Sequence, residues 1–154
     1  LKRNPFCMAK RYQGNRLRQG RYSEAGRVYH VTAVTNGRYP WFADYHLARQ
    51  VCRTLLWSDQ AGATSTLCYV LMPDHLHWLF QLGDGESLSK VMLRVKGRSG
   101  RLCGSAVWQR GYHDHAVRKE ESIRDVARYI VANPLRAGLV SSLRDYPYWN
   151  AAWL

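Results

Sequence analysis

The sequence predicts a single domain of the α+β class, in which helices pack on a mainly antiparallel β-sheet. Segments rich in β-branched and aromatic residues are separated by segments with helical periodicity, in the order strand, helix, strand, strand, helix, strand, helix. Two consecutive strands are joined only by a Pro-Asp turn, which makes them antiparallel neighbours. A chain of 154 residues is long enough to bury a core in one domain. We therefore expect a ferredoxin-like βαββαβ core.

The first strand and helix are predicted over residues 27–62. β-Branched and aromatic residues predict a strand over residues 27–35, and Asn36-Gly37 is a strong turn signal at its end. Asp44 is a suitable N-cap for a helix that runs to about Asp59. The expected core face of this helix carries apolar residues at helical spacing: Leu47, Val51 and Leu55, with Cys52 as a further candidate.

The centre of the chain is a predicted hairpin with strands over residues 64–72 and 75–82 and a turn at Pro73-Asp74. Side chains of the second strand alternate between two faces of the sheet. One face is expected to point into the core because it is apolar and bulky: Leu76, Trp78, Phe80 and Leu82. The opposite face carries His75, His77, Leu79 and Gln81.

Two more helices and one more strand follow. Ser87 is a plausible cap for a helix whose core stripe is Leu88, Val91, Met92 and Val95. Residues 107–115 predict a strand or a strand-like hairpin arm. A last helix over residues 121–132 should end at Asn133-Pro134, because the residue before proline leaves the helical region. Residues 139–154 are ambiguous and could supply a final strand and a cover for the core.

Charge is the strongest global signal. The formal net charge is +12, and within residues 1–30 eight basic residues face a single acidic one. Such a surface repels itself and favours a polyanionic partner, so we expect nucleic acid, with a solvated basic tail as the alternative. Residues 1–26 are predicted to form an irregular basic N-terminal arm, and residues 27–154 the folded domain. A membrane surface is disfavoured because the arm has no amphipathic apolar face.

The cysteines and the apolar segments indicate the compartment. The four cysteines are scattered and form no CxxC pair, which is typical of free thiols in a reducing compartment. No apolar run approaches the ~18–20 residues of a membrane-spanning helix, and no signal-peptide pattern is present. We therefore expect a cytoplasmic protein without a membrane partner.

His75 and His77 stand two residues apart on the face away from the apolar stripe. A strand holds two such imidazoles at a separation that can chelate one cation. The alternative is that they are two partly exposed strand histidines, and the histidine-hydrophobe-histidine pattern alone does not decide between these interpretations. A metal site would need a third ligand, and an enzyme would need a nucleophile as well.

The helix over residues 121–132 offers both groups. Its core stripe consists of Ile123, Val126, Ala127, Ile130 and Val131. Tyr129 projects away from this stripe, and Asn133 lies one turn further along at i+4. A phenol becomes a useful nucleophile only when its proton is taken or its target is polarised, and a divalent cation on the histidines and an amide oxygen would polarise a phosphodiester. The alternatives are a surface-packing tyrosine and an asparagine that caps the helix.

Other residues compete for these roles. Tyr112 is a second possible nucleophile, and His113 and His115 repeat the two-residue spacing, although no apolar alternation flanks them. His115 could still lie at the rim of the site. A nucleotide hydrolase of the histidine-triad type is disfavoured because Leu79 stands where that group needs a third histidine. A hairpin nucleic-acid-binding protein without catalysis remains the alternative function, and a phenol opposite two histidines argues against it.

Four stretches together resemble the REP-associated tyrosine transposases, bacterial members of the HUH single-strand nucleases. They span most of the chain in the order expected for that family: residues 21–32 (RYSEAGRVYHVT), 72–78 (MPDHLHW), 108–115 (WQRGYHDH) and 127–140 (ARYIVANPLRAGLV). The resemblance implies that His75 and His77 bind Mg²⁺ or Mn²⁺ and that Tyr129 attacks a single-stranded DNA phosphate. The products would be a 5′-phosphotyrosine link and a free 3′-OH. The third ligand would be Asn133, where related transposases use the longer glutamine.

The resemblance also implies a substrate and a setting. The substrate would be a repetitive extragenic palindrome, a DNA hairpin with a short single-stranded flank, bound by a monomer in the cytoplasm at the nucleoid. Basic residues of the arm and of the second helix would hold hairpin phosphates, and aromatic residues such as Tyr12 or Tyr22 could stack on unpaired bases. The predicted DNA-binding residues are Arg16, Arg18, Arg21, Lys90, Arg94, Lys96, Arg98 and Arg110.

Overall fold

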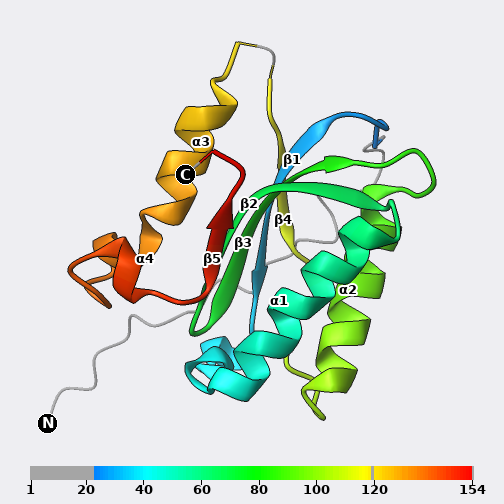
Figure 1. Ribbon diagram of the computed structural model, residues 1–154. Coiled ribbons are helices and arrows are strands. Elements are labelled where there is room, and N and C mark those ends of the chain that lie inside the picture. The colour runs from blue at the N-terminus through cyan, green and yellow to red at the C-terminus, as the bar shows by residue number, and fades with distance from the viewer. Residues whose placement is uncertain (1–22, 119, 154) are drawn as a thin grey trace, which may run out of the picture.

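The computed structural model describes residues 23–118 and 120–153. Most of the predicted basic arm, including Arg16, Arg18 and Arg21, lies outside the described residues. The five strands form one antiparallel sheet in the order β4-β1-β3-β2-β5 (Figure 1). Their bounds are β1 (Val28–Val34), β2 (Thr64–Met72), β3 (His75–Leu82), β4 (His113–Ala116) and β5 (Trp149–Ala151). The first four strands have the order expected of the βαββαβ plan, so the predicted fold class is confirmed.

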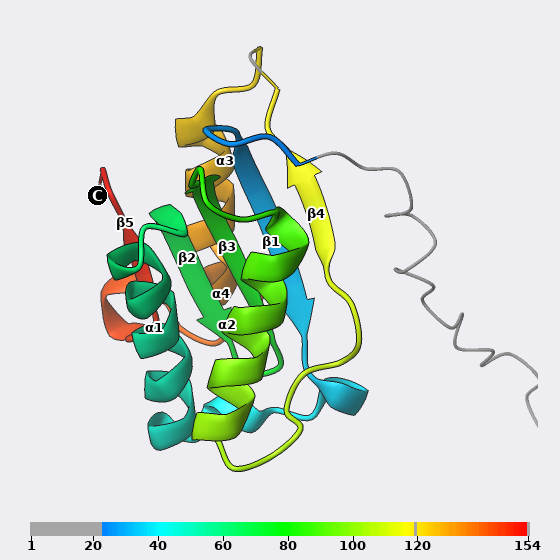
Figure 2. The same cartoon turned by 90° about the vertical axis from the view of Figure 1, so that its right-hand side faces the viewer.

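The helices are divided between the two faces of the sheet. Helices α1 (Tyr45–Gln60) and α2 (Leu88–Leu102) cover one face side by side, while α3 (Ile123–Val131) covers the other (Figures 1 and 2). The four-residue helix α4 (Asn133–Arg136) follows α3 directly. Short 3₁₀ turns lie at Asn36–Arg38, Trp41–Ala43 and Leu143–Asp145. Among the described residues, no helix is both long and apolar enough to cross a membrane.

The predicted helix starts are confirmed by side-chain caps. The Asp44 carboxylate accepts hydrogen bonds from the backbone N–H groups of His46 and Leu47, at 2.8 and 3.2 Å. The hydroxyls of Ser87 and Ser122 cap α2 and α3 in the same way. Each cap satisfies backbone donors that the first helical turn leaves without an intrahelical partner.

Two apolar clusters stabilise the fold, one on each face. The larger cluster lies under α1 and α2 and contains the predicted stripe of β3 with the buried faces of both helices. The smaller cluster lies under α3, where Leu79 packs with Ile130 and Val131. The face of β3 that carries the histidines is therefore partly covered by α3.

Two predicted segments differ from the structure in extent. In the region predicted as a strand over residues 107–115, only His113–Ala116 pairs continuously with β1, and Trp108 forms an isolated bridge with Thr35. In the ambiguous C-terminal stretch, β5 adds a short strand beside β2. Tyr146 covers the sheet edge there, and its hydroxyl donates a hydrogen bond to the Leu71 carbonyl at 2.6 Å.

Candidate active site on the α3 face

His75 and His77 lie on β3 with their rings close together, as the alternation predicts. Their ring centroids are 4.9 Å apart and the rings are nearly perpendicular. The Nδ1 atom of His75 lies 2.6 Å from the carboxylate of Asp74. The Nδ1 atom of His77 lies within hydrogen-bond distance of two groups on β1. Because each Nδ1 is engaged with a protein partner, each ring has its Nε2 left for another ligand.

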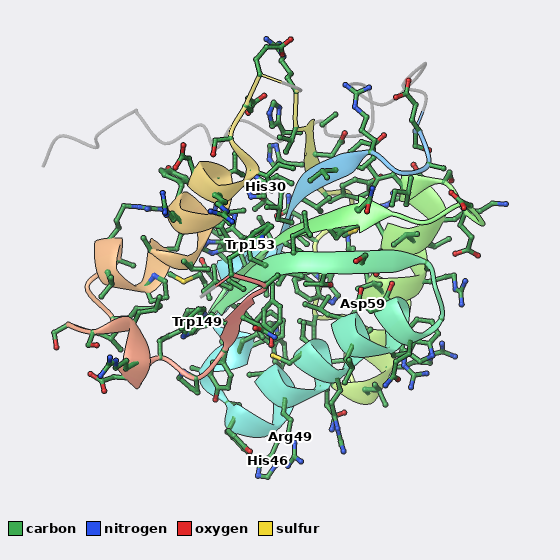
Figure 3. The ribbon with its side chains drawn as sticks, turned by 45° about the horizontal axis from the view of Figure 1, so that its top comes forward. His30, His46, Arg49, Asp59, Trp149 and Trp153 are labelled. Carbon is green, nitrogen blue, oxygen red and sulfur yellow. The ribbon has the colours of Figure 1, made fainter. Side chains whose placement is uncertain are left out.

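The partners of His77 are His30 and Thr32 of the neighbouring strand. His77 Nδ1 lies 3.2 Å from His30 Nε2 and 3.1 Å from the Thr32 hydroxyl. The β1–β3 register pairs Thr32 with His77, so all three side chains share the α3 face (His30 is labelled in Figure 3). Sequence reasoning missed both partners. Their alternate spacing on the first strand was the available signal, but it becomes informative only once the strand register is known.

Burial keeps the imidazoles of His30 and His77 neutral. Loss of hydration lowers the pKa of His77 to about 3, and the nearby charges of His75, His30 and Arg136 add to this effect. Loss of hydration also lowers the pKa of His30 to about 4, with a contribution from His115. A neutral imidazole is the form that binds a metal, because the ring nitrogen must offer a lone pair.

Asp74 supports His75 from the hairpin turn. Partial burial tends to raise the pKa of Asp74, but the hydrogen bonds and positive charges of His75 and Arg38 outweigh burial and hold the pKa below its usual value. Arg38 Nη1 lies 3.2 Å from the other oxygen of this carboxylate. A carboxylate fixed in this way accepts the Nδ1 proton of His75 and sets the ring orientation. The sequence predicts Asp74 only as a turn residue.

Tyr129 lies on α3, above the same face of the sheet. Its side chain is 63% exposed, so the phenol can be reached by a macromolecular substrate. The guanidinium carbon of Arg136, from α4, lies 4.0 Å from the centroid of the Tyr129 ring. Arg136 is also one of the charges that lower the pKa of His77. The same guanidinium is therefore in contact with the phenol and in the electrostatic environment of the histidines.

Asn133 begins α4, one turn after Tyr129. Its Nδ2 donates a hydrogen bond to the Ile130 carbonyl at 2.7 Å, so the side chain helps to close the end of α3. This contact matches the capping interpretation. The amide oxygen is the atom through which Asn133 could reach a cation.

The donor set suits a divalent cation. His75 and His77 each have their Nδ1 engaged by a protein group, which is the outer-shell support that metal-binding histidines usually have. An amide oxygen as the third ligand would leave positions open for substrate oxygens. Within residues 23–118 and 120–153, His, Cys, Asp and Glu side chains form no group of three that could hold a metal.

The basic residues predicted on the second helix lie in a different part of the molecule. Lys90, Arg94, Lys96 and Arg98 belong to α2, which covers the sheet face opposite α3 (Figure 2). Arg94 pairs with Glu86 at 2.7 Å, and the guanidinium groups of Arg94 and Arg98 lie over the Trp57 ring of α1.

Lys96 and Arg110 flank the loop that leads to β4. Lys96 is half-buried, and its ammonium donates to the carbonyls of Gln109 and Gly111, so it holds this loop against α2. Arg110 is exposed and lines a groove of about 680 Å³ between α2 and the loop.

The competing candidates are placed away from the histidine pair or at its edge. Tyr112 is buried in the cluster under α2, with its hydroxyl 3.3 Å from that of Ser89. It is thus on the opposite side of the sheet from His75 and His77. His115 pairs with His30 across β1 and β4, and its Nε2 lies 3.0 Å from the Glu121 carboxylate. His115 is therefore at the rim of the site, as the sequence analysis considered.

Comparisons with known proteins agree with the geometry. The family model described as "Transposase IS200 like" matches residues 25–133, a range that contains His30, His75, His77, Tyr129 and Asn133. The chain is 29% identical over 82 residues to the REP-associated tyrosine transposase of Escherichia coli (strain K12). This match covers 52% of this chain and 50% of that protein. The chain thus spans about half the length of this curated relative.

A solved structure shows the same fold. It is described as a REP-associated tyrosine transposase bound to a REP hairpin, and it superposes with a TM-score of 0.70 and 23% sequence identity. The match covers 84% of this chain and 79% of that one. Because the family model covers more than half of the chain, the family is established: the chain belongs to the IS200-like transposase family.

Proposed function

We propose that this protein nicks and rejoins single-stranded DNA through a covalent link to Tyr129. One observation carries the proposal: the exposed Tyr129 phenol of α3 and the His75–His77 pair, whose Nδ1 atoms are engaged by protein groups, lie on the same face of the sheet. A protein that only binds DNA has no need of this combination. The relatives described as REP-associated tyrosine transposases, one of them bound to a REP hairpin, support a hairpin as the substrate.

The chemistry is a transesterification. The Tyr129 oxygen attacks a phosphorus atom, the phosphorus–O3′ bond breaks, the phenol loses its proton and the departing O3′ gains one. The products are a 5′-phosphotyrosine link and a free 3′-OH. Because one phosphodiester replaces another, attack by a 3′-OH reverses the step without external energy, and strand transfer results.

His75, His77 and the Asn133 amide oxygen would hold Mg²⁺ or Mn²⁺. Such a cation polarises the phosphate and offsets the charge that develops on it. Asp74, His30 and Thr32 orient the two imidazoles through their Nδ1 atoms, so the ligands do not have to reorganise when the cation binds.

A denaturing gel with a labelled hairpin oligonucleotide tests the proposal. With Mn²⁺ or Mg²⁺ we expect a protein–DNA adduct that survives denaturant, and no adduct with a chelator. Tyr129→Phe should abolish the adduct and leave hairpin affinity unchanged. Tyr45→Phe is a matched control, because Tyr45 is also exposed but lies on α1, on the opposite side of the sheet.

Two outcomes would contradict the proposal. Hairpin binding without any adduct would favour a DNA-binding protein that has no catalytic activity. An adduct that persists in Tyr129→Phe but disappears in Tyr112→Phe would identify Tyr112, on the other side of the sheet, as the nucleophile.

A further inference from the structure

Arg136 was not among the residues singled out by the sequence, and its contacts give it a place in the site. Its guanidinium carbon lies 4.0 Å from the centroid of the Tyr129 ring, which is the geometry of a cation–π contact. The ring is otherwise largely exposed, so this contact restrains a side chain that could take several rotamers.

The local backbone explains how Arg136 reaches the ring. Helix α3 ends at Val131, Ala132 closes it, and the Asn133-Pro134 pair starts α4. In one uninterrupted helix, Arg136 would lie seven residues and about 10 Å further along the axis than Tyr129. The break at Ala132, together with a long side chain that leans toward the helix N-terminus, lets the guanidinium return to the ring.

The charge of Arg136 also lies close to the atoms that would react. Because the guanidinium carbon is 4.0 Å from the centroid of the Tyr129 ring, a phosphate attacked by this phenol would lie within the field of Arg136. A positive charge there opposes binding of a metal alone. It favours a phosphate, because an anion between the metal and the guanidinium is attracted by both.

We propose that Arg136 orients the Tyr129 phenol and supplies a fixed positive charge that receives the attacked phosphate beside the cation on His75 and His77. The inference rests on the proposed function and adds to it a positioning residue on α4. Arg136 lies just beyond the segment matched by the family model, which ends at residue 133.

Two substitutions separate the roles of charge and shape. Arg136→Gln removes the charge, and Arg136→Lys keeps it but lacks the planar group that covers an aromatic face. Arg128→Gln is the matched control. Arg128 adjoins Tyr129 in sequence and is equally cationic, but it is exposed and paired with Asp125 at 3.1 Å.

Three measurements are made on each variant: the single-turnover rate of adduct formation at saturating hairpin, the hairpin Kd, and the Kd for Mn²⁺ without DNA. For Arg136→Gln we expect the rate to fall about 10- to 100-fold, since a charge aimed at the reacting phosphate is lost. Hairpin affinity should weaken only about threefold, and Mn²⁺ should bind equally well or up to about threefold more tightly. Arg136→Lys should recover part of the rate, and Arg128→Gln should stay within about twofold of the unmodified protein in all three.

A slower rate together with equal or tighter Mn²⁺ binding distinguishes this role of Arg136 from a purely structural one. A collapsed site would weaken Mn²⁺ binding and slow the rate together, and that result for Arg136→Gln would overturn the inference. A rate within twofold of the unmodified protein would also overturn it, while adduct formation by Tyr129 would still stand. If the unmodified protein forms no adduct, the proposed function fails and this inference fails with it.

Discussion

The two faces of the sheet are built from the same strands but differ in role: one forms the main core, and the other carries the candidate site. On the α1 and α2 face, Trp78 and Phe80 are completely buried, with ring centroids 4.0 Å apart. On the α3 face, the same strand carries His75 and His77, which are only partly buried and surrounded by polar partners. The alternate residues Leu76, Trp78, Phe80 and Leu82 of β3 pack in the larger core, whereas His75 and His77 between them carry the candidate chemistry.

The difference lies in how each face satisfies its side chains. The larger cluster is apolar, and buried polar groups in it have partners, as when Trp78 Nε1 donates to the Thr66 hydroxyl at 2.9 Å. The α3 face keeps His30 and His77 neutral at the cost of their hydration. A site of this kind needs a rigid opposite face, because it contributes little to stability itself.

The largest effect on stability should come from a substitution in the core on the α1 and α2 face. Trp78→Ala should lower the free energy of unfolding by about 3–5 kcal/mol, since it removes a fully buried indole and its hydrogen bond. Tyr129→Phe, on the other face, should change it by less than about 0.5 kcal/mol because this side chain is exposed. Urea denaturation measures both. A Trp78→Ala protein as stable as the parent would show that the two faces do not differ in this way.

The second-largest effect is expected from acidification, which should lower the free energy of unfolding through the buried histidines of the α3 face. The folded-state pKa values of His30 and His77, about 4 and about 3, lie below the ordinary value of 6.5. As the pH drops from about 6.5 to about 4, the unfolded chain binds protons at these histidines and the folded chain does not. The free energy of unfolding therefore falls over this pH range. Between pH 7 and pH 5 the combined loss should be about 3–4 kcal/mol.

His30→Gln should reduce this pH dependence, measured by urea denaturation at pH 7 and pH 4.5. The comparison with the unmodified protein removes the contribution of carboxylates, which both proteins share. Identical pH dependence in the two proteins would mean that His30 is not held neutral by the fold.

The support of His77 can be tested through metal affinity. His30→Ala removes one of the two partners of His77 Nδ1 and should weaken Mn²⁺ binding about 10-fold, measured by titration calorimetry without DNA. His46→Ala is a matched control, because His46 is exposed on α1. Equal Mn²⁺ affinities in the two variants would show that His30 does not orient the ligand.

The smallest effect is expected on α2. Arg98→Gln removes a guanidinium that lies 4.6 Å from the centroid of the Trp57 ring and should cost about 0.5–1 kcal/mol of stability. If Arg98 also contacts a hairpin phosphate, the slope of log affinity against log salt should decrease by about 1. An unchanged slope would assign Arg98 to helix packing alone and remove it from the predicted DNA-binding residues.

Periodicity in the sequence was sufficient for most of the elements and for the faces on which the histidine pair and Tyr129 lie. Alternation along residues 75–82 separated the Trp78 stripe from the histidines, and the 3.6-residue period placed Tyr129 off the core stripe of its helix. Both inferences depend only on local backbone geometry, which is why they could be made without coordinates.

The remaining parts depend on tertiary placement. His30 and Thr32 become partners of His77 only through the β1–β3 register. Arg136 reaches Tyr129 because the helix breaks at Ala132, and Lys96 is tied to two carbonyls of a loop that sequence periodicity does not place. A basic residue at a helical surface position looks the same in the sequence whether it faces DNA or holds a loop.

The most direct test is to identify the residue that carries the DNA. After reaction with a hairpin oligonucleotide and Mn²⁺, the protein would be digested with protease and nuclease, and the nucleotide-bearing peptide sequenced by mass spectrometry. We predict a phosphodiester-linked nucleotide on Tyr129 and on no other tyrosine. A modification on Tyr112, or on any residue of the α1 and α2 side of the sheet, would contradict the assignment of the chemistry to the α3 face.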